Sequence, residues 1–268
     1  LPAPRRASDS AARADAACVI GQRDRLPMPH DLLASTSRPL PEHLGTEGYC
    51  LEIAPERVFL VADTAAGLFY GVQTLIALLS ERPPASLPCV RIVDVPTVPI
   101  RGFMQDLGRG QTPKLETLKH TVERMAALKL NAFFLYLEDG FHFKSHPAIG
   151  RNRDRIEPEE ARELVEHGFR HHVRIIPIHE TIAHMEGILD LPEYRHLREG
   201  AGERQRAIVN LAHPETLRLM EETIGDLCDA FPDPIFFLAT DECLDLGTGE
   251  SKPEAGLIGQ GGLFTGHL

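Results

Sequence analysis

The pattern of hydrophobic and polar positions predicts a small α+β domain over residues 1–98. Its clearest part alternates apolar and polar residues and then repeats apolar residues at helical spacing, whereas residues 1–45 have little periodicity. We expect the helix to begin at Asp63 or Thr64, because either side chain can cap a first turn. The expected strands are 17–20, 49–53, 58–62 and 90–95.

Beyond Pro99 the pattern changes to strands and helices in regular alternation, which predicts parallel strands joined by crossover helices over residues 99–268. Three of these strands are almost continuously apolar, which is typical of strands buried on both faces. We expect Thr112 to cap the first helix and a proline to open each of the other two. The expected strands are 102–107, 132–137, 173–178 and 235–240.

The connections differ in length in a way that favours a (β/α)8 barrel of the TIM type. The segments that leave the strands are long, notably 138–157 and 179–213, and such loops build the active site of a barrel. The alternative, an open dinucleotide-binding sheet, requires a third glycine after Gly108-Arg109-Gly110, where Pro113 stands instead. We therefore predict an α/β fold with a barrel, apparently truncated after about four strands because a glycine-rich tail begins at Gly247.

Composition and charge narrow the function. The 268 residues are 43% hydrophobic and carry a net charge of −11, which is typical of a soluble globular protein and disfavours binding to nucleic acid. No apolar run reaches the length of a membrane span. The five cysteines form no C-x-x-C pair, and we expect most of them to be buried. No cofactor is predicted, and compartment and oligomeric state stay open.

Two adjacent carboxylates, Asp241 and Glu242, follow the last apolar strand and are the strongest candidates for catalysis. Neighbouring side chains diverge along a strand, so the pair does not readily flank one glycosidic bond, as two carboxylates do in most glycosidases. A mechanism with one acid, in which the other carboxylate positions a group of the substrate, fits this spacing better. A salt bridge or a helix cap is the structural alternative.

His179, Glu180 and His184 suggest a zinc protease, but the spacing H-E-x-x-x-H is one residue too long. On a helix the two histidines would lie about 140° apart. We predict no metal here and expect both histidines at the barrel mouth. Glu138-Asp139, Asp106 and Arg109 end other strands, and a ring of such groups suits a sugar, although strand-end ion pairs are the alternative.

Five segments of the chain, taken together, resemble glycoside hydrolase family 20, the β-N-acetylhexosaminidases. The resemblance covers the accessory domain and the first half of the catalytic barrel. Its two clearest departures are Ala239-Thr240, where the family has Gly-Gly, and Ile182-Ala183, where it has Pro-Gly. The matching segments are 47–79, 101–110, 128–139, 174–189 and 231–242.

The resemblance implies an exo-acting, retaining enzyme that removes terminal N-acetylglucosamine or N-acetylgalactosamine from glycans with help from the substrate's acetamido group. It implies that Glu242 is the general acid and base and that Asp241 holds the acetamido group. Arg109 would bind sugar hydroxyls, and Asp139 and His184 would form a pair that tunes the acid.

Two alternatives remain: a catalytically silent sugar-binding relative, and another barrel glycosidase with a conventional carboxylate pair. Because a half barrel leaves an open sheet edge, we also expect weak or no activity and poor solubility from these residues alone.

Overall fold

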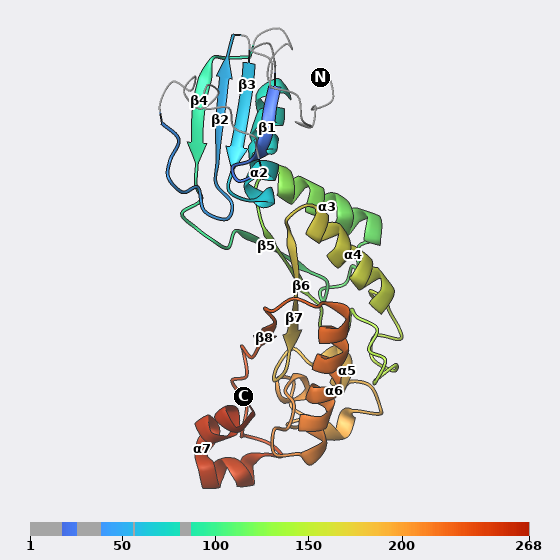
Figure 1. Ribbon diagram of the computed structural model, residues 1–268. Coiled ribbons are helices and arrows are strands. Elements are labelled where there is room, and N and C mark those ends of the chain that lie inside the picture. The colour runs from blue at the N-terminus through green and yellow to red at the C-terminus, as the bar shows by residue number, and fades with distance from the viewer. Residues whose placement is uncertain (1–17, 26–38, 56, 81–86, 268) are drawn as a thin grey trace. The chain divides into compact units, whose positions relative to one another are not determined.

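The computed structural model describes residues 18–25, 39–55, 57–80 and 87–267 (Figure 1). The contacts within it divide the chain into two compact units. The first comprises residues 1–101 with 124–130, and the second comprises residues 102–123 with 131–268. The predicted boundary lay at residue 98.

The first unit contains a four-stranded sheet in the order β1-β3-β2-β4, with helix α2 (Ala65–Ser80) packed against it (Figure 1). Strands β2 and β3 pair antiparallel and form a hairpin, while β1 pairs parallel to β3. The helix cap is Thr64, whose Oγ1 accepts a hydrogen bond from the backbone N–H of Gly67 at 3.1 Å. The strands are β1 (Cys18–Gln22), β2 (Tyr49–Ala54), β3 (Arg57–Ala62) and β4 (Val90–Asp94).

The second unit contains four parallel strands in chain order, which confirms the predicted alternation. Three helices connect them, and Pro158 and Pro214 open the second and third as expected. The strands are β5 (Gly102–Asp106), β6 (Ala132–Tyr136), β7 (Arg174–Glu180) and β8 (Phe237–Ala239). The connecting helices are α3 (Leu115–Ala127), α4 (Pro158–Arg170) and α6 (Pro214–Ala230).

Three local expectations are wrong. Helix α3 begins at Leu115, and Thr112 does not cap it, because its hydroxyl donates to the carbonyl of Asp154 at 2.7 Å. Strand β8 is not buried on both faces: Phe237 is 48% exposed, because within the described residues β8 pairs only with β7. Most cysteines are not buried either. Of the five, Cys50 is buried, Cys243 is partly buried, and Cys18, Cys89 and Cys228 are exposed.

The long segment between β7 and α6 carries short helices and is tied to the residues after β8. The buried carboxylate of Glu199 accepts hydrogen bonds from the backbone N–H of Gly249 at 2.8 Å and from the hydroxyl of Ser251 at 2.7 Å. A buried charge is stable only with such partners. The short helices are α5 (Glu186–Leu189), η1 (Arg195–Leu197) and η2 (Gln205–Ala207).

The expected glycine-rich tail forms a helix, α7 (Lys252–His267), interrupted at Gly259, where φ is 76°. Its Leu263 packs into an apolar cluster with Ile182 and Ala183, which precede His184. Burial of this apolar surface offsets the low helix propensity of glycine. None of the helices in the described ranges has both the length and the apolar content required to traverse a bilayer.

Candidate active site

Strand register places several ionisable side chains on one face of the second sheet. Tyr136 of β6 lies opposite Asp106 of β5 and Ile178 of β7, so these three side chains share a face. Glu180 stands two residues beyond Ile178 and therefore faces the same way. Its partner in β8 is Ala239, two residues before Asp241. The carboxyl ends of the strands thus gather acids at one edge.

His179 lies on the opposite face and is fully buried. Its Nε2 is 3.1 Å from the hydroxyl of Thr223 in α6, and burial lowers the pKa of His179 to about 4. The expectation that His179 lies at the barrel mouth is therefore wrong. Alternation along β7 turns the imidazole toward the helices and leaves Glu180 at the mouth.

Glu180 is a buried carboxyl group beside the candidate catalytic pair, and it is not among the site residues expected from the sequence. The hydroxyl of Tyr136 donates to its Oε1 at 2.6 Å, while its Oε2 is shielded from solvent and accepts no hydrogen bond from the described residues. Burial raises the pKa of Glu180 to about 7, and the nearby charge of Asp241 acts in the same direction. The side chain is therefore largely protonated below about pH 7.

His184 brings the two parts of the site together. Its Nε2 lies 3.3 Å from Oε2 of Glu242, and its Nδ1 lies 3.4 Å from a guanidinium nitrogen of Arg109. One ligand atom from each of Glu180, His184 and Asp241, which we call the mouth group, lies within 4.8 Å of the others. Glu242 is 71% exposed and contacts His184, whereas Asp241, which is also exposed, stays close to the buried Glu180.

Arg109 is held over the end of β6. Its guanidinium pairs with Glu138, lies 3.6 Å from Asp106 and stacks 5.1 Å from the ring centre of Tyr136. Asp106 also orders the turn, because its Oδ1 accepts the backbone N–H of Gly108 at 2.8 Å and that of Arg109 at 3.2 Å. Arg109 therefore presents a positioned cation at the mouth.

Asp139 and Glu138 differ from the expected arrangement. Asp139 accepts a hydrogen bond from Arg153 at 2.7 Å and packs close to Gly187, and no contact with His184 is found among the described residues. The preceding Glu138 pairs with Arg109 instead. Burial raises the pKa of Glu138, and the charge of Arg109 offsets part of this rise. Glu138 stands two residues beyond Tyr136, so continued strand alternation is the signal that could have selected it.

Backbone strain gathers at the same edge. Of the five non-glycine residues with positive φ in the described ranges, three are Glu138 (46°), His184 (53°) and Glu242 (53°). Left-handed backbone is costly for side chains of this size, and such residues cluster at functional sites. The strained residues are thus the ones that form the ion pairs Arg109–Glu138 and His184–Glu242.

Parallel strands that deliver carboxylates, an arginine and a histidine to their carboxyl ends define a barrel-type enzyme for a polar, hydroxyl-rich ligand. The comparisons with known proteins make this class specific. Residues 4–95 match the family model "Glycosyl hydrolase family 20, domain 2", and residues 99–258 match "Glycosyl hydrolase family 20, catalytic domain". The chain belongs to glycosyl hydrolase family 20.

Similar proteins carry names consistent with this family. A β-hexosaminidase of Porphyromonas gingivalis is 26% identical over 78% of this chain and 30% of its own length. One from Akkermansia muciniphila is 27% identical over 74% of this chain and 46% of its own length. The crystal structure of a β-N-acetylhexosaminidase from Bacteroides fragilis superposes with a TM-score of 0.66, at 26% identity, over 81% of this chain and 48% of that one. The chain thus spans less than half the length of these relatives.

Proposed function

We propose that this chain carries the catalytic carboxylates of an exo-acting β-N-acetylhexosaminidase that works by substrate-assisted, retaining catalysis. The observation that carries the proposal is the divergence of Asp241 and Glu242. Asp241 lies beside the buried Glu180, whereas Glu242 is held at 3.3 Å by His184, which also stands within 4.8 Å of Asp241. Adjacent acids in different surroundings suit different tasks on one substrate. The names of the relatives support a terminal N-acetylhexosamine of a glycan as that substrate.

Glu242 is the proposed general acid and base. It gives its proton to the glycosidic oxygen as the bond from that oxygen to the anomeric carbon breaks. After the alcohol has left, the Glu242 carboxylate takes a proton from the water that attacks the same carbon. His184, whose Nε2 lies 3.3 Å away, positions the carboxyl group.

Asp241 is the proposed partner of the substrate's acetamido group. Its carboxylate accepts a hydrogen bond from the acetamido N–H, which turns the acetamido carbonyl oxygen toward the anomeric carbon. That oxygen attacks as the leaving group departs and forms a cyclic oxazolinium ion. Asp241 must be anionic to stabilise this cation, and a protonated Glu180 beside it avoids two like charges. Attack by water reopens the ring, and two inversions give net retention.

Arg109 is the proposed ligand for sugar hydroxyls, because its guanidinium is 51% exposed and held by Glu138 and Asp106. Fixed donors of this kind bind hydroxyls without a large loss of side-chain entropy. The family resemblance implies that Asp139 pairs with His184 near the acid. The ion pair of Asp139 with Arg153 supports a positioning role behind Glu138 instead. No metal or cofactor takes part in the proposed steps.

The decisive experiment compares two chromogenic substrates, 4-nitrophenyl N-acetyl-β-glucosaminide and the β-glucoside that lacks the acetamido group. Hydrolysis of the first alone, with β-configured product in NMR spectra, supports the proposal. Equal hydrolysis of both would favour a conventional carboxylate pair. Calorimetric binding of the thiazoline analogue of the oxazolinium, without turnover of either substrate, would favour a silent sugar-binding protein.

A further inference from the structure

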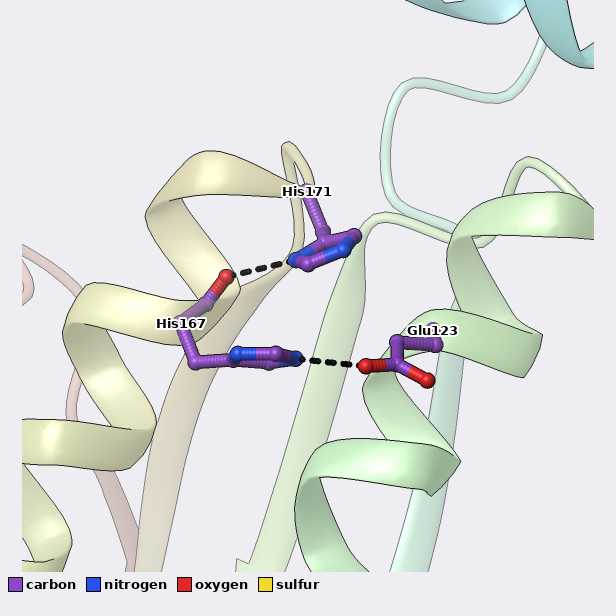
Figure 2. A group of neighbouring side chains, drawn as sticks. All are labelled: Glu123, His167 and His171. Carbon is purple, nitrogen blue, oxygen red and sulfur yellow. Dashed lines mark hydrogen bonds and ion pairs between the residues drawn. The ribbon is translucent and has the colours of Figure 1, made fainter.

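A second group of histidines and a carboxylate lies on the outer helices of the second unit. Glu123 comes from α3, and His167 and His171 come from α4 and the residue that follows it, as Figure 2 shows. We call these three residues the helix group. His171 stands three residues before β7, whereas the mouth group lies at the other end of that strand. Seven residues of strand separate the two groups by roughly 20 Å.

His167 directs a shielded nitrogen at the carboxylate across the helix interface. Its Nε2 lies 3.4 Å from Oε1 of Glu123 (Figure 2), yet this atom is closed off from solvent and makes no hydrogen bond in the described structure. The side chain as a whole is only 13% exposed. A buried nitrogen without a hydrogen-bond partner is costly, and a ligand that accepts its lone pair would remove that cost.

His171 is already held in the form that a metal requires. Its Nδ1 lies 2.9 Å from the backbone carbonyl oxygen of His167. A carbonyl can only accept a hydrogen bond, so Nδ1 carries the proton and the lone pair of the neutral ring is on Nε2. A hydrogen bond of this kind orients most metal-binding histidines. The rings of His167 and His171 lie 4.4 Å apart between centroids, at an angle of 32°.

The carboxylate of Glu123 is the charge beside the two imidazoles that attracts a cation. Its second oxygen lies 3.1 Å from Nδ1 of His120, which holds the carboxylate in place. The two nearby cations oppose a further positive charge, but each is paired with carboxylates of its own. Lys119 bonds to Glu116 at 2.8 Å and to Glu163 at 2.6 Å, and Arg170 bonds to Glu166 at 2.8 Å.

We propose that Glu123, His167 and His171 bind a zinc ion that joins α3 to α4. The i and i+4 spacing puts both imidazoles on one face of a helix, and the facing helix supplies the carboxylate. The three ligand atoms lie within 4.8 Å of one another. Bonds of 2.0–2.1 Å in a tetrahedral site separate ligand atoms by about 3.4 Å, so side-chain adjustments of roughly 1 Å suffice. A water molecule completes the site.

This ion is structural rather than catalytic. It lies at the amino ends of the strands, the end of a barrel that serves stability, and it would stabilise the folded chain in proportion to the logarithm of its concentration. The H-E-x-x-x-H segment at residues 179–184 is not part of this site. The helix group is discontinuous in the sequence, and only packing of α3 against α4 brings it together.

The test measures Zn²⁺ binding to the complete 268-residue chain after treatment with a chelator, by calorimetry and by the visible spectrum of bound Co²⁺. Zn²⁺ could also bind at the mouth group, so each site is assigned with variants. We expect His167→Ala and Glu123→Gln each to weaken one binding event about 100-fold, and His184→Ala to leave that event unchanged. Glu123 is 46% exposed, so its replacement tests the site without disturbing the core.

His196→Ala is the matched control. His196 lies 3.0 Å from Glu215, and its ring is 5.4 Å from that of His213, yet these residues form no group of converging ligand atoms. Unchanged zinc affinity in this variant, and a melting temperature that rises with Zn²⁺ in the parent but not in Glu123→Gln, support the proposal. Unchanged affinity in Glu123→Gln and His167→Ala, or loss of all binding in His184→Ala, would overturn it.

Discussion

The mouth group and the helix group combine the same residue types at opposite ends of β7, but the buried partner differs. In the mouth group the carboxyl of Glu180 is buried and its pKa is raised to about 7, so the environment stores a proton. In the helix group the imidazole of His167 is the shielded partner, and Glu123 is 46% exposed and charged. Burial of the acid favours proton chemistry, and burial of the base beside an exposed acid favours a cation.

The largest expected effect tests the proton donor. Glu242→Gln cannot protonate a leaving group, so we expect kcat/KM for an N-acetylglucosaminide with an alkyl aglycone to fall about 1,000-fold. The loss with a 4-nitrophenyl aglycone should be smaller, because that alcohol leaves without protonation. Steady-state kinetics on both substrates measure the difference.

Glu250→Gln is the control, because Glu250 is an exposed acid eight residues further along. If Glu242→Gln lowers the rates for both aglycones equally, Glu242 is not the general acid.

The next effect tests the separation of the two acids. Asp241→Asn keeps the shape of the side chain but loses the charge that faces the oxazolinium, so we expect kcat to fall about 100-fold. Binding of the thiazoline analogue should weaken by a similar factor, as isothermal calorimetry can show. An Asp241→Asn chain that binds the analogue as tightly as the parent would break the assignment of Asp241 to the acetamido group.

A smaller effect concerns the stored proton of Glu180. Its pKa is raised from 4.5 to about 7 on folding, so its contribution to stability is complete below pH 4.5 and is lost as the pH rises to about 7. The corresponding free energy is about 3 kcal/mol, at 1.36 kcal/mol per pH unit. Glu180→Gln, a permanent mimic of the neutral acid, should therefore flatten the fall in melting temperature between pH 5 and pH 8.

The exposed Glu203 provides a matched variant, and Glu203→Gln should leave that pH profile unchanged. Kinetics add a second reading, because kcat of the parent should decline above about pH 7 as Glu180 loses its proton, whereas Glu180→Gln should stay active there. Parallel pH profiles for Glu180→Gln and the parent would show that Glu180 does not titrate in this range.

The smallest effect tests the support beneath Arg109. A Cβ atom at Gly108 would lie 2.5 Å from Oε2 of Glu138, so Gly108→Ala forces that carboxylate to move. Because Glu138 holds the guanidinium, we expect KM to rise about tenfold with little change in kcat. Gly225→Ala, where a Cβ meets nothing within 4 Å, is the control. A large loss of kcat in Gly108→Ala would place Arg109 in the chemical step instead.

Much of this architecture follows from the sequence, because hydrophobic periodicity encodes which faces are buried. The apolar runs located all four parallel strands and placed Asp241 and Glu242 directly after the last of them. The cap of α2 could be narrowed from the sequence to Asp63 or Thr64, and the structure selects the threonine. Local chemistry alone could not place Thr112, whose hydroxyl has a distant carbonyl as its partner.

The details of the site depend on which face each residue occupies. Strand alternation puts Glu180 and His179 on opposite faces of the sheet, and it would select Glu138 rather than Asp139 for the mouth. The sequence motifs contain both members of each pair, so a motif alone does not say which of the two residues faces the site. The role of Glu180 also depends on Tyr136 and Asp241, which are far from it in sequence. Helix α7 was missed because five glycines lower its local propensity, whereas its contact with Ile182 comes only from the tertiary fold.

That contact gives helix α7 a bearing on proton transfer. Leu263 packs against Ile182 and Ala183, so the helix supports the backbone just before the strained His184. Local opening of α7 would remove the apolar surface that holds the imidazole near Glu242. If Glu242 is the general acid, the last helix and the segment before His184 should open together, and the lifetime of the contact between the histidine and the acid would then follow the opening of the tail.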